Sequence, residues 1–421
     1  MPTVPDDDEL ELIRRSGVVL RVGRLSLSAG TGSYRVKASM ARVARALGID
    51  RHEAHVTLTE ITTTSHSGPS FRTEVTEVRT IGVNVDRLTE LEHLAGRVDA
   101  AQSVTPDEVT AELDRIADKP PLYPVALNAL WAAIACGAFS FLNGGRVVEV
   151  LAVLVGAFLG QGLRRTLLDR RLNQFGVTML SAAVACLGYL AFVGLLRAFG
   201  AASAGNEAGY VSAVLFLVPG FSLVTGFLDL AKLDFSAGVA RLVHALMVLT
   251  SAALALWAVS LVVGLSPDPP APDALDPGLL LALRFVASFV GVLGFALMFN
   301  SPWRIALAAA GVGMVANALR LALVDGAVPP QAAAAVAALV VGLLTAVVAP
   351  RLDVPRITVY VPAVTIMVPG VLAYRAVFHI SNGQTVEALA FGVQAALVVA
   401  ALAIGLAVAR MLTDRTWAYE R

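Results

Sequence analysis

The sequence predicts an α-helical polytopic membrane protein, with ten transmembrane helices arranged as two inverted five-helix repeats after a small cytoplasmic α/β domain. The 421 residues are 57% hydrophobic and only 15% charged, which excludes a soluble globular protein. Ten apolar stretches of roughly 20 residues, the length that crosses a bilayer, follow residue 121. One apolar sequence motif also occurs twice, 150 positions apart, and predicts that the membrane region is an internal repeat.

Residues 1–121 carry most of the charge and are expected to form the α/β domain. Its acidic start, Asp6–Asp8, suits the positive end of a helix dipole, and Thr105 with Glu108 forms a capping-box pattern. The expected elements are helices at about 6–28, 36–47, 88–98 and 106–116, and strands at 55–64 and 71–85 joined by a hairpin turn at 65–70.

Several residues of this domain belong to types that serve as nucleophile, base or metal ligand, namely His52, His55 and Ser65-His66-Ser67. No partner acid, third ligand or glycine-rich phosphate loop accompanies them in the sequence. Gating, assembly or sensing is therefore the expected role of the domain, and we expect no enzyme activity, cofactor or metal. A membrane-bound hydrolase with a catalytic soluble domain is the alternative.

The distribution of Lys and Arg predicts the direction of the chain. Turns on the side of residues 1–121 hold eleven of them, against five at the other ends, so both termini are expected in the cytoplasm. The protein is then a multi-pass protein of the cytoplasmic (inner) membrane. Its predicted spans are 122–142, 146–163, 175–198, 209–229, 240–265, 278–299, 303–323, 330–349, 357–378 and 386–409. They give a first repeat at 122–265, an extracytoplasmic linker at 266–277, and a second repeat with a short cytoplasmic tail at 278–421.

The repeated motif contains Tyr-Val, Ala-Val and Val-Pro-Gly with the same spacing in residues 210–220 and in residues 360–370. Each copy places a Pro-Gly pair inside a span, where proline removes a backbone donor and breaks the helix. In hydrocarbon such a break is tolerated where protein groups or a water-lined cavity satisfy the freed carbonyls. Since the copies lie in the fourth and ninth spans, they cross the membrane in opposite senses, as in inverted transporter repeats. A weaker match relates the sequence around Gly156 in the second span to the sequence around Gly313 in the seventh span. The alternative is that each proline only kinks a packed helix.

The broken helices also define the candidate site. An unwound step exposes carbonyls to an ammonium group, and the next helix start presents N–H groups to a carboxylate, which suits a zwitterionic amino acid or a small carboxylate. The candidate substrate-binding residues are Pro219, Gly220, Ser222, Thr225, Pro369, Gly370 and Tyr374. The candidate proton- or ion-coupling residues, chosen because ionisable groups within spans are costly, are Asp229, Asp234, Arg241, Arg375 and His379. The alternative to a coupling role is a structural one. Asp229, Asp234 and Arg241 would then form an ionic group at the membrane interface, and the Arg375 side chain would extend to that interface.

Short motifs in the N-terminal part and in the membrane part of the chain together carry a resemblance to a known family. The N-terminal part has Gly23-Arg24-Leu25 and Val43-Ala44-Arg45-Ala46-Leu47-Gly48, and the membrane part has Val218-Pro219-Gly220, Asp229-Leu230, Asp234, Gly238, Arg241, Val368-Pro369-Gly370 and Tyr374-Arg375. With these motifs the chain resembles the threonine/serine exporter family over nearly its whole length. The resemblance implies a cytoplasmic domain joined to ten spans, and export of threonine and serine driven by the proton-motive force. Some members divide the architecture over two chains and are associated with succinate export.

We therefore expect a secondary transporter that exports threonine, serine or similar small hydroxylated amino acids, by proton antiport with alternating access at the two Pro-Gly breaks. An exporter of small dicarboxylates such as succinate is the alternative in the same class. The expected partners are the amino acid, protons and the lipid bilayer, but no nucleic acid. Self-assembly into a homo-oligomer is compatible with the sequence. No nucleotide-binding P-loop occurs, so an ion gradient is the expected energy source.

Overall fold

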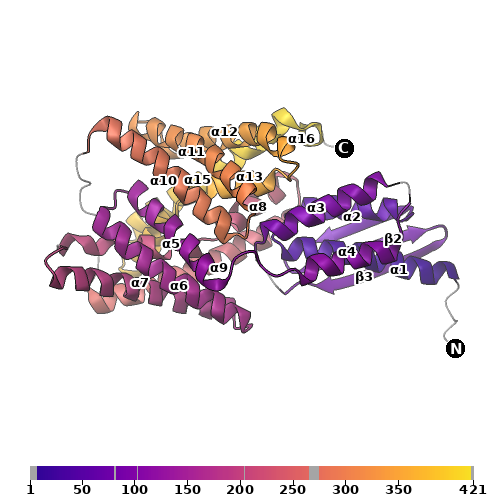
Figure 1. Cartoon of the computed structure of the whole chain (residues 1–421), viewed down its shortest axis with the longest axis horizontal. Coiled ribbons are helices and arrows are strands. Elements are labelled where there is room, and N and C mark those ends of the chain that lie inside the picture. The colour runs from indigo at the N-terminus through magenta and orange to yellow at the C-terminus, as the bar shows by residue number, and fades with distance from the viewer. Residues whose placement is uncertain (1–6, 80–81, 102, 203, 265–274, 419–421) are drawn as a thin grey trace. The chain divides into compact units, whose positions relative to one another are not determined.

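The computed structural model describes residues 7–79, 82–101, 103–202, 204–264 and 275–418 (Figure 1). The chain divides into two compact units. The first comprises Met1–Leu122 together with Thr225–Leu242, and the second comprises Tyr123–Val224 together with Val243–Arg421. The first unit thus takes in a segment of the apolar region, which the boundary predicted at residue 121 did not assign to it.

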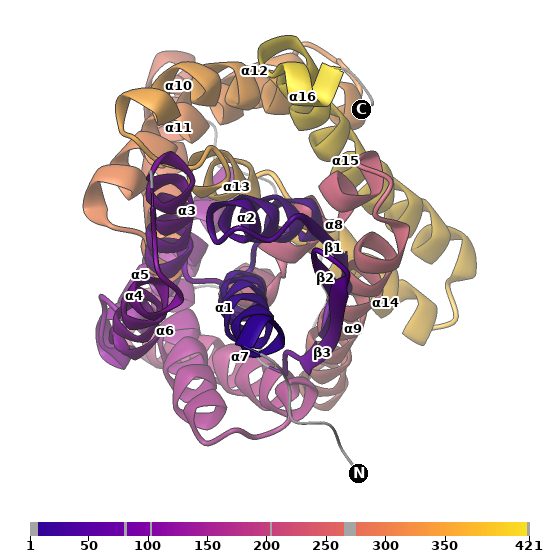
Figure 2. The same cartoon turned by 90° about the vertical axis from the view of Figure 1, so that its right-hand side faces the viewer.

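In the N-terminal segment of the first unit, the described residues form helices α1 to α4 and a three-stranded antiparallel sheet in the order β1-β2-β3 (Figure 2). Helix α1 packs against β2 and β3, and Val22 of this helix belongs to a core that also contains Met40, Ile61, Leu91 and Leu113, each at most 2% exposed. The elements are α1 (Asp7–Ser28), α2 (Ser33–Ala46), β1 (Arg51–Val56), β2 (Glu60–Ser67), β3 (Ser70–Glu77), α3 (Val85–Ala100) and α4 (Pro106–Asp118).

The capping box that was predicted at the start of α4 is confirmed. Thr105 Oγ1 accepts a hydrogen bond from the Glu108 N–H at 3.3 Å, and Glu108 Oε2 accepts one from the Thr105 N–H at 2.8 Å. These reciprocal bonds satisfy two donors that the helix itself leaves unpaired.

The predicted hairpin is present, since β2 and β3 pair antiparallel across the predicted turn, but the first predicted strand is interrupted by a second turn. Thr57 Oγ1 accepts the Glu60 N–H at 3.1 Å, and this side-chain bond reverses the chain between β1 and β2. The second expected strand also ends early, at Glu77. Val85 instead starts α3, where Asn84 Oδ1 caps the helix by accepting the Arg87 N–H at 3.0 Å. The predicted strand segment 80–81 lies outside the described residues.

The apolar region folds into helices that match the predicted spans closely. The elements are α5 (Val125–Leu142), α6 (Val147–Asp169), α7 (Gln174–Ala198), the 3₁₀ helix η1 (Ala204–Leu217), α8 (Gly220–Ala231), α9 (Phe235–Val263), α10 (Pro277–Met298), α11 (Trp303–Asp325), α12 (Pro330–Arg351), α13 (Ile357–Thr365), α14 (Gly370–Ser381), α15 (Thr385–Thr413) and α16 (Arg415–Ala418). Among the described residues, eight helices are long and apolar enough to cross a membrane, or up to ten spans if each of two bent pairs is one span.

The bent pairs fall at the two Pro-Gly steps. The turn from η1 to α8 bends the chain by 58°, and the turn from α13 to α14 bends it by 49°. The segment before the first Pro-Gly step is a 3₁₀ helix, whereas the segment before the second is an α-helix. The repeated motif did not predict this difference.

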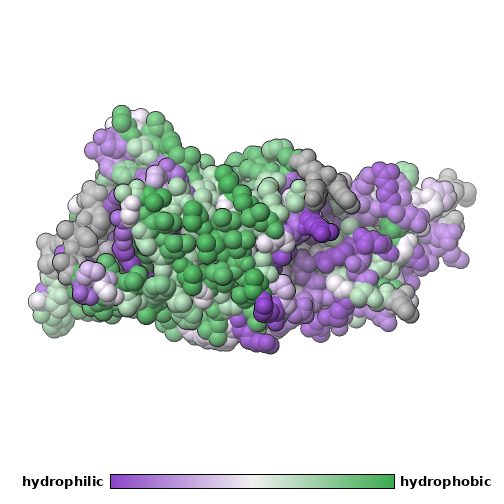
Figure 3. Space-filling view, turned by 90° about the horizontal axis from the view of Figure 1, so that it is seen from above, coloured by the Kyte–Doolittle hydropathy of each residue, from purple (hydrophilic) through white to green (hydrophobic). Residues whose placement is uncertain are grey.

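The helices of the second unit present large apolar side chains on their outer surface (Figure 3). Leu187, Leu246, Leu281 and Leu389 are each about half exposed or more, at 51%, 61%, 49% and 66%. A soluble protein rarely exposes an apolar surface of this extent, whereas a surface in contact with lipid requires it.

The helices approach one another through small residues. A Cβ atom on Gly405 of α15 would lie 2.3 Å from the carbonyl oxygen of Ala335 in α12, and one on Gly156 of α6 would lie 2.4 Å from the carbonyl oxygen of Ala185 in α7. Only glycine therefore permits these backbone contacts, which are typical of helix packing in membranes.

We predict that Gly405→Ala separates α12 from α15 and destabilises the protein by about 1–3 kcal/mol, as overpacking does. The measurement is the midpoint of thermal unfolding of the purified protein in detergent. Gly311→Ala is the matched control, because a Cβ at Gly311 meets no atom within 4 Å. Equal midpoints for the two variants would contradict the packing described here.

Candidate functional site

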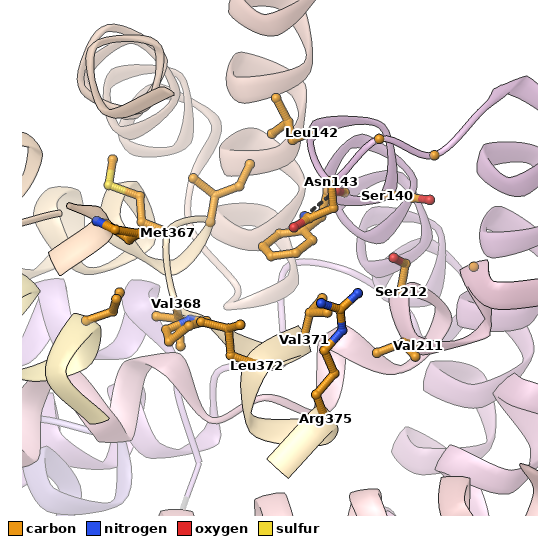
Figure 4. A pocket seen from close by; sticks show the side chains of 18 of the residues that line it. Ser140, Leu142, Asn143, Val211, Ser212, Met367, Val368, Val371, Leu372 and Arg375 are labelled. Carbon is orange, nitrogen blue, oxygen red and sulfur yellow. Dashed lines mark hydrogen bonds between the residues drawn. The ribbon is translucent and has the colours of Figure 1, made fainter. Parts of the chain in front are cut away.

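A cavity of about 320 Å³ lies in the second unit at the second Pro-Gly break (Figure 4). Its walls come from the end of α5, the start of α6, η1, the end of α11 and the step between α13 and α14. A volume of this size is at the small end of the range for ligand sites, about 300–1,000 Å³. It therefore suits a small molecule.

Each break is a three-residue turn with proline at its centre. The Gly370 N–H donates to the Val368 carbonyl at 2.9 Å, and the Gly220 N–H donates to the Val218 carbonyl at 2.8 Å. Pro369 has φ −82° and ψ 59°, the values of an inverse γ-turn. Proline suits the centre of this turn, since it fixes φ near −65° and has no N–H to leave unpaired. The turn redirects α14 away from the axis of α13 and so helps to shape the cavity.

The opposite rim of the cavity is formed where α5 ends. Gly144 has φ +87°, and the Gly145 N–H donates to the Ser140 carbonyl at 2.8 Å while the Gly144 N–H donates to the Phe141 carbonyl at 2.9 Å. These are the two bonds of a Schellman motif, which requires the left-handed conformation that glycine adopts readily. The motif turns the chain so that Ser140 and Asn143 line the cavity.

One wall of the cavity is polar and the other is apolar. Arg375 extends from α14 into the cavity toward Ser212 of η1, and Asn143 lies on the same side, whereas Met367, Val368 and Leu372 form the facing apolar wall (Figure 4). The Arg375 guanidinium also lies 5.6 Å from the centre of the Phe391 ring. This cation–π contact limits the positions available to the guanidinium.

Two further charged groups line the cavity. Glu149 is only 2% exposed, and its Oε2 accepts the Arg146 N–H at 3.0 Å at the start of α6. Arg320 donates from Nε to Asn317 Oδ1 at 2.9 Å, and Asn317 in turn donates to Ser288 Oγ at 2.8 Å. The cavity thus offers guanidinium groups for a carboxylate, a carboxylate for an ammonium group, and hydroxyl and amide groups for polar substituents.

The structure brings together only some of the predicted site residues. Pro369 and Arg375 line the cavity, and Gly370 follows directly. Tyr374 points elsewhere, with its hydroxyl 2.8 Å from that of Tyr210. His379 pairs through Nδ1 with Gln384 Oε1 at 2.6 Å and stacks on Phe391.

The remaining predicted residues belong to the first break and to α8 and α9. Pro219 and Gly220 form the first break, and Ser222 is half-buried on α8 in the second unit. Four residues lie in the first unit: Thr225, Asp229, Asp234 and Arg241.

In the first unit, Asp229 is fully buried and Arg241 is 2% exposed. The Ser33 N–H donates to Asp229 Oδ1 at 2.9 Å, and Arg241 Nε lies 3.5 Å from Asp229 Oδ2. Asp234 accepts a hydrogen bond from Ser33 Oγ at 2.8 Å and pairs with Lys37. Asp229 and Asp234 therefore contact the N-terminal helix α2, and Arg241 contacts Thr31 directly before it.

Sequence reasoning missed Glu149, Arg320, Asn143, Ser140 and Ser212 as site residues. A signal was present for Glu149, which is the sole acidic residue between Asp118 and Asp169 and lies within a predicted span. Arg320 is one of the five basic residues at the other ends of the spans, which entered only the prediction of the direction of the chain. The other three residues are small polar groups without a distinctive pattern.

Of the candidate residues in the N-terminal sheet, His52 and Ser65 lie against each other. His52 Nδ1 lies 2.9 Å from Ser65 Oγ, and Ser65 is fully buried. The pKa of His52 is lowered by burial, an effect that the negative charge of Glu74 offsets only in part. A buried hydroxyl cannot reach a substrate without a rearrangement of the sheet.

Among the described residues, the helices that are long and apolar enough to cross a membrane, two pairs of them bent at Pro-Gly turns, are those of an α-helical polytopic membrane protein. The chain belongs to the threonine/serine exporter family. Residues 17–263 match the family model described as "Putative threonine/serine exporter", and residues 284–412 match the model described as "Threonine/Serine exporter, ThrE". The predicted family resemblance is thereby confirmed.

Curated relatives carry related names. The chain is 25% identical to the "Threonine/serine exporter" of Corynebacterium glutamicum over 91% of its own length and 80% of that protein. It is 25% identical to the "Probable threonine/serine exporter" of Mycobacterium tuberculosis over 90% of its length and 72% of that protein. It is 27% identical to the "Probable succinate transporter subunit YjjP" of Escherichia coli over 53% of its length and 84% of that protein. No solved structure matches the chain.

We predict that Leu372→Cys and Ser212→Cys react with a hydrophilic maleimide, because both positions line the cavity. The background is a variant in which the native Cys136 and Cys186, both buried, are replaced by alanine. Ala310→Cys, fully buried in α11, is the control and should stay unlabelled. Labelling in whole cells and in inside-out vesicles measures the side of access. Absence of labelling from both sides would show that the cavity is closed to water.

Proposed function

We propose that this protein is a secondary transporter that exports threonine, serine or similar small hydroxylated amino acids across the cytoplasmic membrane by proton antiport. Both termini are cytoplasmic, and access to the site alternates through movement at the two Pro-Gly turns. The chain is not an enzyme in this proposal. Family membership supports export, and the names of the Corynebacterium and Mycobacterium relatives support the cargo.

The observation that carries the proposal is the combination of charges in the cavity. An α-amino acid has a carboxylate, an ammonium group and, in threonine and serine, a hydroxyl. Arg375 suits the carboxylate through paired N–H donors, and Glu149 suits the ammonium group. Ser140, Ser212 and Asn143 supply partners for the hydroxyl.

Equivalent contacts in the two halves support the inverted repeat and hence alternating access. A Cβ on Gly220 would lie 3.4 Å from Val368 Cγ2, and a Cβ on Gly370 would lie 2.8 Å from Val218 Cγ2, so each break packs on the other. A second pair of contacts is equivalent within each half: Gly156 packs on Ala213, and Gly313 packs on Ala363. A pseudo-two-fold relation between the halves accounts for both pairs, and inverted repeats of this kind exchange conformations about a central site.

The second candidate function is export of small dicarboxylates such as succinate. Its supporting observation is that Arg320 and Arg375 both line the cavity, which gives two guanidinium groups for two carboxylates. The name of the Escherichia coli relative fits this cargo. Glu149 argues against it, because a buried carboxylate in the lining would repel a dianion.

The test is uptake of radiolabelled threonine and succinate into inside-out vesicles, where export appears as accumulation in the lumen. An acidic lumen should stimulate threonine uptake if protons leave in exchange. Vesicles without the protein are the control. Uptake of neither compound would contradict both candidate functions and would reopen the hydrolase alternative.

We predict that Glu149→Gln distinguishes the two cargoes. Glutamine keeps an oxygen that can accept the Arg146 N–H but removes the negative charge. The KM for threonine should then rise about tenfold, as expected for loss of one charge-assisted contact. Succinate uptake should be unchanged or improved. A weaker effect on threonine than on succinate would favour the dicarboxylate cargo.

We predict that Asp229→Asn abolishes the stimulation of threonine uptake by an acidic lumen, because asparagine cannot exchange a proton at this position. The amide oxygen can still accept the Ser33 N–H, and the amount of protein in the membrane, measured in parallel, separates a loss of coupling from a loss of folding. Asp325→Asn is the control, since that carboxylate is about half exposed and pairs with Arg284 at the end of α11. Full stimulation in the Asp229 variant would assign this residue to structure alone.

A further inference from the structure

Helix α2 begins without a capping side chain of its own. Its N-cap residue is Gly32, and the Asp229 carboxylate, 196 residues from Ser33 along the chain, accepts the Ser33 N–H instead. A carboxylate at this place satisfies a free backbone donor and interacts favourably with the helix dipole. The absence of a side chain at residue 32 makes room for it, because a Cβ on Gly32 would lie 2.8 Å from Asp229 Oδ1.

Three more contacts join the same two segments. Arg241 donates to the Thr31 carbonyl at 3.2 Å, Ser33 Oγ donates to Asp234 Oδ2 at 2.8 Å, and Lys37 pairs with Asp234. We call the four residues Thr31, Gly32, Ser33 and Lys37 the α2 clamp. It binds the carboxylates of Asp229 in α8 and of Asp234 in the turn before α9, and it accepts a hydrogen bond from Arg241 in the second turn of α9.

Burial makes these contacts costly to lose. Asp229 and Arg241 are both almost completely inaccessible to solvent, and their separation of 3.5 Å is long for an ion pair. A buried charge needs further hydrogen bonds to offset its desolvation. The Ser33 N–H and the Thr31 carbonyl are such partners, so the N-terminal domain supplies part of the solvation of both charges.

The clamp acts on the helix that follows the first Pro-Gly turn. Helix α8 runs without interruption from Gly220 to Ala231, and Asp229 is nine positions after Gly220, roughly 13 Å along the axis. The rotation of α8 about its axis decides where the Asp229 side chain points. A clamp on Asp229 therefore fixes that rotation at the far end of the helix.

We propose that the α2 clamp is a positioning element of the transporter, through which the N-terminal domain sets the orientation of Asp229 and of α8 during turnover. The effect on export rests on the proposed function. The clamp residues take no part in binding the cargo. Loss of the clamp should therefore lower the maximal rate of export and leave the KM for the cargo unchanged.

The first experiment uses Gly32→Ala in the full chain, which forces Asp229 away from the helix end. Maximal threonine uptake into inside-out vesicles should fall about tenfold, the loss expected for one charge-assisted hydrogen bond, with KM unchanged. Hydrogen–deuterium exchange of the peptide that contains residues 33–37 should become faster. Gly96→Ala is the control, because a Cβ there meets no atom within 4 Å.

The second experiment is a charge exchange, which remains informative if Gly32→Ala does not fold. Lys37→Asp and Asp234→Lys should each lower the maximal rate, and the double variant should restore a large part of it, since the two charges then pair again. Rescue of the rate is a result that a merely destabilised domain would not give.

The outcomes are distinguishable. Faster exchange at residues 33–37 with unchanged export in Gly32→Ala would show that the contact exists but does not position the transporter, which overturns the proposal. Unchanged export in both single charge variants would do the same. If the parent protein itself moves neither threonine nor succinate, the proposed function fails, and this inference fails with it.

Discussion

The need to satisfy backbone polar groups without water shapes the apolar unit. Proline interrupts two spans, and in hydrocarbon each interruption would leave carbonyls without partners. The chain meets this constraint with an inverse γ-turn at each step and by packing each turn against the other, so that Gly220 faces Val368 and Gly370 faces Val218. Irregular backbone is thus kept among protein groups, and the cavity opens at one of the two turns.

The features that depend on local sequence were predictable. Apolar length gave the spans to within a few residues for most helices, although α6 and α15 continue beyond their predicted ends, to Asp169 and Thr413. The repeated motif located both turns, because proline restricts the backbone next to it and interrupts the helix there. The short strands were predicted less well, since a turn from Thr57 to Glu60, closed by a backbone and a side-chain hydrogen bond, divides the first of them.

The site could be predicted only in part, because it depends on which helices meet. Glu149, Arg320 and Arg375 come from three separate helices, and no periodicity within one helix indicates that they line one cavity. The contact between Ser33 and Asp229 is equally non-local. Asp229 was a candidate from the sequence, but nothing in the local pattern around it related it to the start of α2.

The distribution of the cavity residues along the chain bears on the half-length relatives. Ser140, Asn143, Glu149 and Ser212 precede residue 263, where the first family match ends, whereas Arg320 and Arg375 lie in the second match. A chain that corresponds to the first match alone would carry the carboxylate but neither of these guanidiniums. The Escherichia coli relative, which is matched over 53% of this chain, is named a subunit. In this chain, the carboxylate and the two guanidinium groups of the cavity thus come from separately matched segments of one polypeptide.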